Sequence, residues 1–364
     1  MKKVFYILIL TLSISISCND SITDELGPIY DRSMLLQNWH EFHIVPLHEK
    51  FKRDLNDFRS ITTTFKENPN NSSLENLRSA FLKAYISWQN IEMFNIGKAE
   101  EIYFTSKVNI YPVNTARVES NITSGGYDLA NANNFSAQGL PTIDYLLYGI
   151  SPESEIAEKL SKEEYFNYLQ DITDEMIQDS NDVLNYWESN KSEFLNSTEN
   201  TSTSSMNMMV NDFIYYYEKG FRANKIGIPG GVFSSGPLTK NVEGYFSKNY
   251  SKVLALESYK AIMRFYNGVN IEGNNYPGSS LKSIVTNLDN NNNENNLGNR
   301  ITDKMVVANQ RISELEDNFI NQINNDNTKF LQVFDAVQEV VVLLKVDMLQ
   351  LLNINVDYVD ADGD

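Results

Sequence analysis

The residues best suited to hold a metal ion are the three histidines, His40, His43 and His48, which share one nine-residue window. His40 and His43 are three residues apart, so a helix would place both imidazoles on one face, within reach of a single metal ion. Pro46 should bend or end such a helix, and His48 then need not share that face. His40 and His43 are therefore candidate metal ligands. The alternative, which we favour, is that they are partly exposed polar residues on an amphipathic helix.

Motifs of the common enzyme classes are absent from the sequence. The histidine window reads His-Glu-Phe-His, which is shorter than the His-Glu-x-x-His pattern of zinc peptidases. Gly230 and Gly231 predict a turn, because the Lys-Ser/Thr pair of a phosphate-binding loop does not follow them. There is also no serine-nucleophile elbow and no dinucleotide fingerprint. The sequence therefore leaves the catalytic residues unassigned.

An acidic segment closes the sequence, with Asp360, Asp362 and Asp364 at alternate positions and Gly363 between the last two. This spacing is typical of the beginning of a calcium-binding loop. The remaining ligands of such a loop, including its bidentate glutamate, do not follow. We favour a solvated acidic tail, and weak binding of a hard cation is the alternative.

The beginning of the sequence predicts export. Lys2 and Lys3 precede an apolar run over 4–12, and small residues lead to Cys18, the single cysteine of the chain. This is the pattern of a secretory signal peptide. A lone cysteine at its end is best explained as a lipidated residue, because it cannot form an internal disulfide. We predict a signal peptide over 1–17, a tether over 18–29 and a membrane-anchored envelope protein. The alternative is ordinary cleavage with an incidental cysteine.

The net charge of the chain limits the kinds of molecule that it can bind. The 364 residues include 30 Lys and Arg against 48 Asp and Glu, a formal net charge of −18 at pH 7. Nucleic acid is a poor partner for such a chain, because contacts to phosphates require clustered basic residues. The hydrophobic fraction of 41% is sufficient for a large core.

Apolar residues recur every three or four positions in most of the chain, which predicts an all-α fold. The segments with this spacing are 34–44, 51–58, 74–91, 163–187, 206–217 (closed by Gly220), 253–266 (closed by Asn267-Gly268) and 330–351. Polar stretches interrupt the pattern twice. The first predicts a linker over 196–205 between an N-terminal domain, 30–195, and a C-terminal domain, 206–364. The second, 287–299, predicts a surface loop.

Several short blocks, taken in order, resemble the imelysin-like proteins, an exported bacterial family first described as metallopeptidases. They are 44–46 (Ile-Val-Pro), 87–92 (Ser-Trp-Gln-Asn-Ile-Glu), 110–112 (Ile-Tyr-Pro), 138–149 (Gln-Gly-Leu-Pro-Thr-Ile-Asp-Tyr-Leu-Leu-Tyr-Gly), 225–231 (Lys-Ile-Gly-Ile-Pro-Gly-Gly), 242–245 (Val-Glu-Gly-Tyr), 265–268 (Phe-Tyr-Asn-Gly) and the Asp-rich end. The resemblance implies two helical-bundle domains with a cleft between them. It also implies a role in bacterial iron uptake, with iron or another metal as the bound species and other envelope components as partners.

The signature of that family, Gly-x-His-x-x-Glu, is altered in this chain. It falls on Gly139 to Asp144, where the histidine is replaced by Pro141 and the glutamate by Asp144. Proline has no lone pair to offer a metal, so the imidazole ligand is lost. Asp144 keeps a carboxylate on a shorter side chain, and it stays a candidate ligand.

We expect the functional surface to be a cleft where 139–149 meets 225–231 and Glu243. Asp144, Lys225 and Glu243 would supply its polar contacts. By resemblance, Trp88, Glu92 and Tyr111 would form its walls. The alternative is a buried salt-bridge network that holds the two halves together.

The predicted function is that of a lipid-anchored binding component for iron or an iron-bearing ligand. A metallopeptidase is the alternative, which the altered signature disfavours. A scaffold for another envelope component is a third hypothesis.

Overall fold

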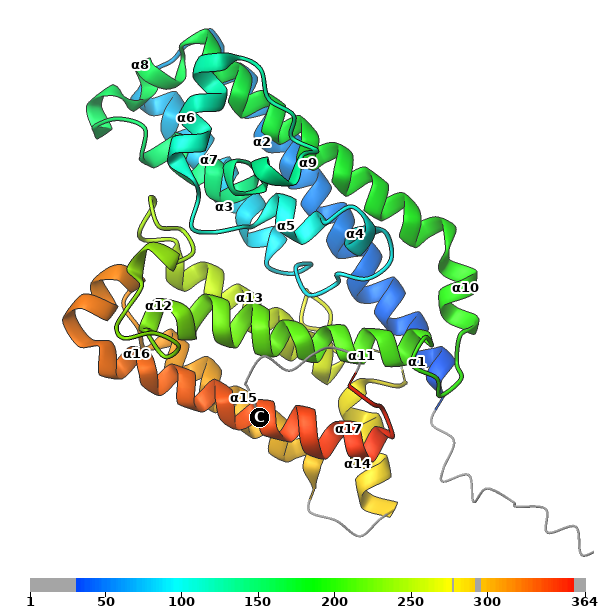
Figure 1. Cartoon of the computed structure of the whole chain (residues 1–364). Coiled ribbons are helices and arrows are strands. Elements are labelled where there is room, and N and C mark those ends of the chain that lie inside the picture. Colours follow the sequence, from blue (N-terminus) through cyan, green and yellow to red (C-terminus); the bar gives the residue numbers. More distant parts are fainter. Residues whose placement is uncertain (1–30, 277, 292–295, 357–364) are drawn as a thin grey trace, which may run out of the picture.

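The computed structural model describes residues 31–276, 278–291 and 296–356, and these residues form helices joined by turns and loops, with no β-strand (Figure 1). The prediction of an all-α fold is confirmed. The predicted signal peptide, Cys18, the tether and the acidic end lie outside the described residues.

The N-terminal part is built around three long helices. Helix α2 packs against both α3 and α9, and shorter helices, among them α6 and α7, lie beside this layer (Figure 1). The elements are α1 (Arg32–Trp39), the π-helix η1 (His40–Ile44), α2 (Val45–Glu67), α3 (Asn71–Trp88), α4 (Lys98–Glu101), α5 (Phe104–Val108), α6 (Thr115–Ser124), η2 (Ala132–Ala137), α7 (Gly139–Tyr148), η3 (Glu153–Glu155), α8 (Ile156–Leu160), α9 (Glu163–Ser189) and α10 (Lys191–Asn196).

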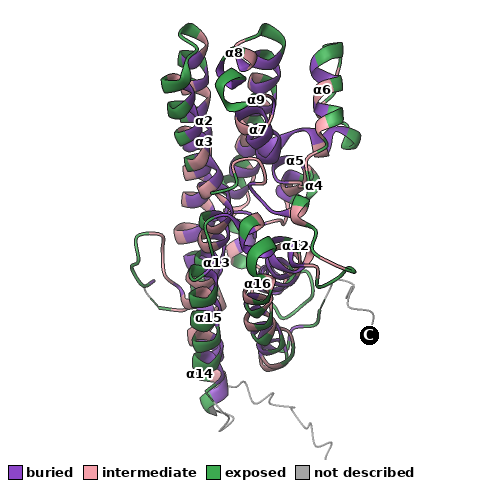
Figure 2. Ribbon diagram, turned by 90° about the vertical axis from the view of Figure 1, so that its left-hand side faces the viewer, coloured by how far each residue is buried: buried purple, intermediate pink, exposed green. Residues whose placement is uncertain are grey.

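The C-terminal part is a second group of helices, in which α16 packs against α15 and η4. Its elements are α11 (Ser205–Tyr215), the π-helix η4 (Tyr216–Gly227), α12 (Ile228–Gly230), η5 (Thr239–Asn241), α13 (Ser251–Asn267), α14 (Leu281–Asn291), α15 (Leu297–Ser313), α16 (Phe319–Val342), the π-helix η6 (Leu343–Met348) and α17 (Leu349–Leu352). Figure 2 shows that exposed residues lie along the outer sides of both groups.

Helix boundaries follow the local sequence. Asn70 begins α3 with a capping box, because its side chain accepts the backbone N–H of Ser73 while the Ser73 hydroxyl accepts the N–H of Asn70. Helix α13 ends at Gly268, which adopts φ +71° as predicted from the Asn267-Gly268 pair. These local signals fix where the apolar faces begin and end.

The two parts share one continuous apolar core, which includes residues from Leu35 to Ile354. They meet through contacts of α3 with α13 and of α1 with α11. Residues 197–204, within the predicted linker, contain no helix. The division into two domains with an open cleft stays a prediction.

Two expectations about the histidine window are wrong. Pro46 does not end the helix: α1, η1 and α2 run on without a break, and Pro46 lies in the first turn of α2. The π-helical turn before it has a wider hydrogen-bond spacing, which accommodates a residue without an N–H donor. The three histidines are buried instead of partly exposed, because the helix is covered on several sides by the core.

Two further expectations need correction. Of the predicted surface loop over 287–299, the described residues 287–291 and 297–299 are helical, since α14 extends to Asn291 and α15 begins at Leu297. Asn-rich sequence is compatible with helix where tertiary packing outweighs propensity. Gly220 does not close a helix either, because it lies within η4, where a Cβ atom would overlap the ring of Tyr216.

Within the described residues, no helix is both long enough and apolar enough to cross a membrane.

Candidate functional site

Helix α7 carries the altered signature, and its first residue has to be glycine. Gly139 adopts φ +75°, and a Cβ atom there would overlap the backbone carbonyl oxygens of Lys107 and Val108. Pro141 follows in the first turn, where its missing N–H costs no intrahelical hydrogen bond. Gly139 therefore lets the beginning of α7 pack closely against α5. Pro141, in the first turn, occupies the position of the family histidine.

Asp144 is buried one turn further along α7 and holds a loop from the C-terminal part. Its two carboxylate oxygens accept the backbone N–H groups of Phe246, at 2.8 Å, and Ser247, at 3.1 Å. Burial raises the pKa of Asp144 to about 6, although these hydrogen bonds oppose the shift, and the nearby Glu243 adds to it. Asp144 therefore changes charge near neutral pH and ties α7 to the loop after η5.

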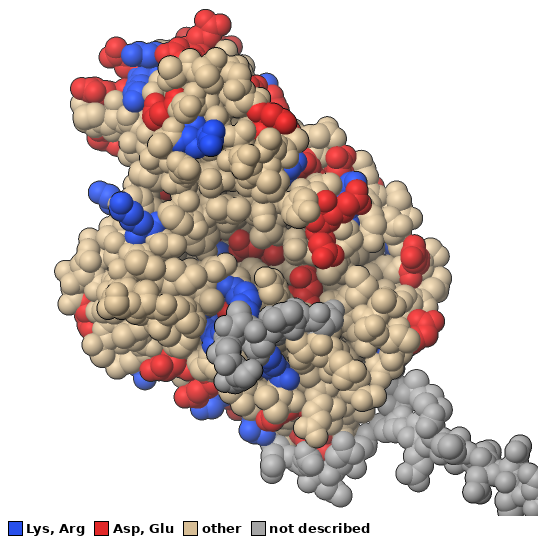
Figure 3. Space-filling model, in the orientation of Figure 1, with Lys and Arg blue, Asp and Glu red and all other residues tan. Residues whose placement is uncertain are grey.

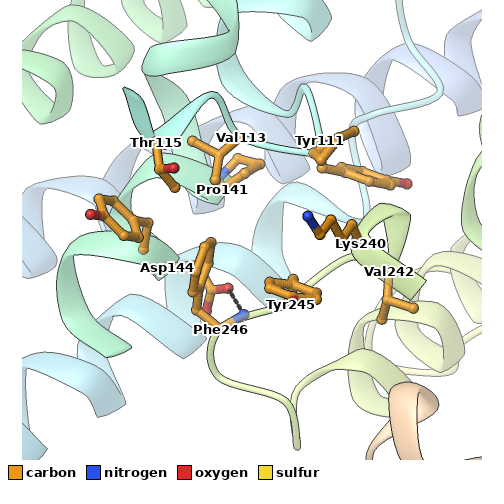
Figure 4. Close-up of a pocket in the computed structure, with 12 residues that line it drawn as sticks. Tyr111, Val113, Thr115, Pro141, Asp144, Lys240, Val242, Tyr245 and Phe246 are labelled. Atoms are coloured by element: carbon orange, nitrogen blue, oxygen red, sulfur yellow. Dashed lines mark hydrogen bonds between the residues drawn. The ribbon is translucent and has the colours of Figure 1, made fainter. Parts of the chain in front are cut away.

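A pocket of about 310 Å³ opens between α7 and that loop (Figure 4). We call it the motif pocket. Its lining comes from both parts of the chain: Tyr111, Pro112, Val113, Thr115, Pro141, Asp144, Tyr145, Lys240, Val242, Gly244, Tyr245 and Phe246. Figure 4 shows the ammonium group of Lys240 extending toward the middle of the pocket. The walls are aromatic and aliphatic, with few polar groups, which is usual for small-molecule sites.

Beside this pocket, Lys225 joins two buried glutamates. Its Nζ atom lies 2.9 Å from Glu92 and 2.7 Å from Glu243. It also donates to Gln89 Oε1 at 2.8 Å. Gln89 and Asn109 in turn donate to Glu243 Oε1, at 2.9 and 2.8 Å. We call these residues the junction network, because Gln89, Glu92 and Asn109 belong to the N-terminal part and the other two to the C-terminal part.

Two tyrosines complete the junction network. Tyr216 donates its hydroxyl to Glu92 at 2.7 Å, and Tyr85 donates to Asn109 at 3.0 Å. Burial by itself would raise the pKa of Glu92, but Lys225 and the hydrogen bonds lower it below its ordinary value. Burial likewise opposes the charge of Lys225, yet Glu243 and Glu92 raise its pKa. Glu92 and Lys225 are therefore both held in their charged forms, and the junction network links the two parts of the chain.

The structure separates the predicted site residues into two sets. Tyr111, Pro141 and Asp144 line the motif pocket. Glu92, Lys225 and Glu243 form the junction network instead, which is the arrangement of the alternative hypothesis. Gly139 fixes the beginning of α7. The remaining candidate, Trp88, packs in the core against Phe51 and Phe104.

The candidate ligands His40 and His43 lie apart from this region and have different surroundings. His40 Nε2 lies 2.9 Å from the carbonyl oxygen of Trp187. His43 packs edge-on against the rings of Phe265 and Tyr276, and burial lowers its pKa to about 3. Burial also lowers the pKa of His48 to about 4.

Sequence reasoning missed several residues of both sets. In the junction network these are Gln89, Asn109, Tyr85 and Tyr216. One signal was available, because Gln89 lies three positions before Glu92 in the same family block. In the motif pocket the missed residues include Lys240, Tyr245 and Phe246. Tyr245 ends the family block 242–245 but was not assigned to the site, and no pattern marked Lys240 in η5 or Phe246 in the loop after it.

The residues at the signature do not fit a resident metal ion. Pro141 supplies no donor atom, and both oxygens of Asp144 already accept backbone N–H groups. Glu243, whose charge acts on Asp144, is committed to Lys225, Gln89 and Asn109. Throughout the described part of the chain, no three His, Cys, Asp or Glu side chains are grouped closely enough to hold a metal. We therefore derive no chemistry through a metal at this position.

Comparison with solved structures supports the fold. An imelysin-like protein from Psychrobacter arcticum 273-4 superposes with a TM-score of 0.71 at 15% identity, covering 90% of this chain and 97% of the other. A protein from Parabacteroides distasonis ATCC 8503, provisionally named an iron-regulated protein A precursor, gives a TM-score of 0.65 at 14% identity, with the same coverage. No curated protein matches the chain. The family model of imelysin, peptidase family M75, matches residues 44–345. This chain therefore belongs to the imelysin family.

Proposed function

We propose that this protein is a lipid-anchored component of the bacterial cell envelope that binds iron in a chelated form, as part of iron uptake. The motif pocket is the binding site, and the bound species is a small organic iron complex with negative charge. A chelated ion brings its own coordination sphere, so the pocket needs shape, apolar walls and a positive charge, and no set of metal ligands.

The observation that carries this proposal is the composition of the motif pocket. Tyr111, Tyr145, Tyr245 and Phe246 provide flat aromatic surface, and Lys240 reaches in from the rim. Aromatic faces favour a flat organic ligand, and the ammonium group favours an anion. The name of the Parabacteroides distasonis protein supports the connection to iron.

A metallopeptidase would need a metal-activated water and a general base in the same pocket. Pro141 and the doubly engaged Asp144 supply neither a ligand set nor an accessible base. The binding function is therefore favoured over the peptidase.

Equilibrium dialysis tests the binding function with ferric citrate and ferric 2,3-dihydroxybenzoate as probes. We expect one iron complex to bind per chain, and Lys240→Glu to weaken binding at least about tenfold, because it replaces an attraction by a repulsion. Lys260→Glu, an exposed site on α13, is the matched control. Ferrous sulfate tests binding of the bare ion. Tight binding of ferrous ion, unaffected by Lys240→Glu, would contradict the proposal.

The lipid anchor is tested separately with Cys18→Ser. We expect the wild-type protein in the membrane fraction and the variant in the soluble fraction, because a multiply acylated cysteine is a stable anchor. An intact mass without acyl groups would contradict this part of the proposal and leave the binding site unaffected.

A further inference from the structure

Three side chains that carry oxygen atoms meet in the N-terminal part, where α6, α7 and α9 pack against one another. Glu119 of α6 accepts hydrogen bonds from two phenol groups. The hydroxyl of Tyr145, on α7, donates to one carboxylate oxygen at 2.6 Å. The hydroxyl of Tyr165, in the first turn of α9, donates to the other at 2.5 Å. We call these three residues the tyrosine–glutamate cluster.

The cluster combines fixed rings with an accessible carboxylate. Tyr145 and Tyr165 are each only 8% exposed and belong to the apolar core, whereas Glu119 is half-buried. On the face drawn in Figure 3, acidic and basic side chains are mixed at the end of the N-terminal part that carries α6 and α8. An ion from solvent can therefore reach Glu119, while the core holds the two rings in place.

The oxygen atoms of the cluster suit a hard cation with three positive charges. Carboxylate and phenolate oxygens are hard ligands, which prefer hard metal ions. With both phenols deprotonated, the three residues carry three negative charges. Around a small octahedral cation with bonds of about 2.0–2.1 Å, adjacent oxygen ligands are about 2.9 Å apart. The carboxylate oxygens and hydroxyls of the cluster are already at similar separations, 2.5 and 2.6 Å.

The hydrogen bonds at Glu119 differ from those at Asp144 in one chemical respect. Asp144 accepts backbone N–H groups, which do not give up their protons to a metal. The donors at Glu119 are phenols. Burial and the charge of Glu119 raise the pKa of Tyr145 and of Tyr165, so both stay protonated without a cation. A bound cation reverses this balance and releases the protons to solvent, and each hydrogen-bond donor then becomes a ligand.

We propose that Glu119, Tyr145 and Tyr165 form a binding site for a hard trivalent cation such as Fe(III), held by two phenolates and one carboxylate. Binding exchanges two phenol protons for one ion, without transfer of electrons, and water fills the remaining coordination positions. Only Tyr145 also lines the motif pocket. The inference does not depend on the ligand proposed for that pocket, because Glu119 and Tyr165 can be changed separately.

Titration with ferric nitrilotriacetate tests the site, because this complex leaves coordination positions of the iron open. A phenolate bound to Fe(III) gives a visible charge-transfer band. We expect this band to saturate at one ion per chain. Tyr165→Phe and Glu119→Gln should each weaken binding at least about tenfold, since even residues that only support a metal ligand contribute that much.

Two variants serve as controls in this titration. Tyr127→Phe removes a phenol that donates to a single carboxylate, Asp171, at 2.5 Å, and it should leave the band unchanged. Lys240→Glu should also leave the band unchanged, because Lys240 belongs to the motif pocket. The absence of a band, a band that Tyr165→Phe and Glu119→Gln do not weaken, or an equal loss in either control would overturn the proposal.

A second measurement uses the unchanged chain, so it does not depend on how the variants fold. Gallium(III) nitrilotriacetate provides a trivalent ion without visible absorption, and ultraviolet difference spectra report the formation of tyrosinate. We expect two tyrosinates for each gallium ion bound, and none with zinc acetate. No tyrosinate signal with gallium, or an equal signal with zinc, would overturn the proposal.

Discussion

In the junction network, each charged group has a partner of opposite charge and further hydrogen bonds, whereas the motif pocket beside it has one buried carboxylate and one lysine that do not pair. Lys225 is surrounded by Glu92, Glu243 and Gln89. Lys240 extends into open space. A network in which every charged group is paired stabilises the fold, while a pocket with apolar walls and an exposed lysine can accept a ligand. Family resemblance predicted both sets as one site, and only their contacts distinguish them.

The largest effect is expected from a substitution that breaks the junction network. Lys225→Met leaves Glu92 and Glu243 buried without a counter-charge, so we expect the free energy of unfolding to fall by about 3–5 kcal/mol. Urea unfolding followed by circular dichroism measures this change. Lys304→Met removes one member of an exposed ion pair and serves as the control, with an expected loss below about 1 kcal/mol. Similar losses in the two variants would mean that the network is not a structural element.

The second prediction concerns His43, which is buried against aromatic rings. Burial lowers its pKa from 6.5 to about 3, so the folded state binds fewer protons than the unfolded state. The resulting stability is present above pH 6.5 and is lost as the pH falls. Between pH 7 and 4.5 the loss should be about 2.5 kcal/mol.

His43→Phe tests this value, because phenylalanine suits the aromatic surroundings of Phe265 and Tyr276 and does not titrate. Thermal melts at several pH values should show that the variant loses less stability in acid than the wild type. Parallel pH curves would indicate that His43 does not control the acid sensitivity.

The third prediction concerns Asp144, whose pH dependence has the opposite sign. Its pKa is raised from 3.8 to about 6, so the folded state binds more protons than the unfolded state. Its contribution to stability is complete below pH 3.8 and disappears as the pH rises through 6. Relative to Asp144→Asn, the wild type should lose about 2 kcal/mol between pH 4 and 7. Chemical unfolding of both proteins at these two pH values measures the difference. A constant difference would show that Asp144 does not titrate in this range.

Much of the fold could be predicted because it depends on local patterns. The apolar spacing in 163–187 and 253–266 indicated α9 and α13, since one face of each helix is buried in the core. The π-helical turns escaped prediction, because they depend on packing around residues such as Gly220 and Pro46. The burial of His40 and His43 escaped prediction for the same reason: helical spacing shows which residues share a face, and it does not show what covers that face.

The candidate site was predictable only in part. Asp144, Pro141 and Tyr111 were found through an ordered set of family blocks, and all three line the motif pocket. The pocket roles of Lys240, Tyr245 and Phe246 were not predicted, because the loop after η5 is positioned by hydrogen bonds from the backbone of Phe246 and Ser247 to Asp144. Such contacts between residues about a hundred positions apart leave no periodic signal in the sequence.

Lys240→Gln is expected to have the smallest effect on stability. It is also the sharpest test of the difference between the motif pocket and the junction network. This side chain is exposed at the rim of the motif pocket, so its replacement should change the free energy of unfolding by less than about 0.5 kcal/mol. Binding of ferric citrate or ferric 2,3-dihydroxybenzoate should nevertheless weaken about three- to tenfold, because an attraction to the anion is lost. Isothermal titration calorimetry at low salt, beside urea unfolding of the same protein, provides both values. Lys225→Met should show the reverse pattern, with a large loss of stability. If Lys240→Gln lost stability and kept its affinity for both complexes, the motif pocket would be a structural element like the junction network.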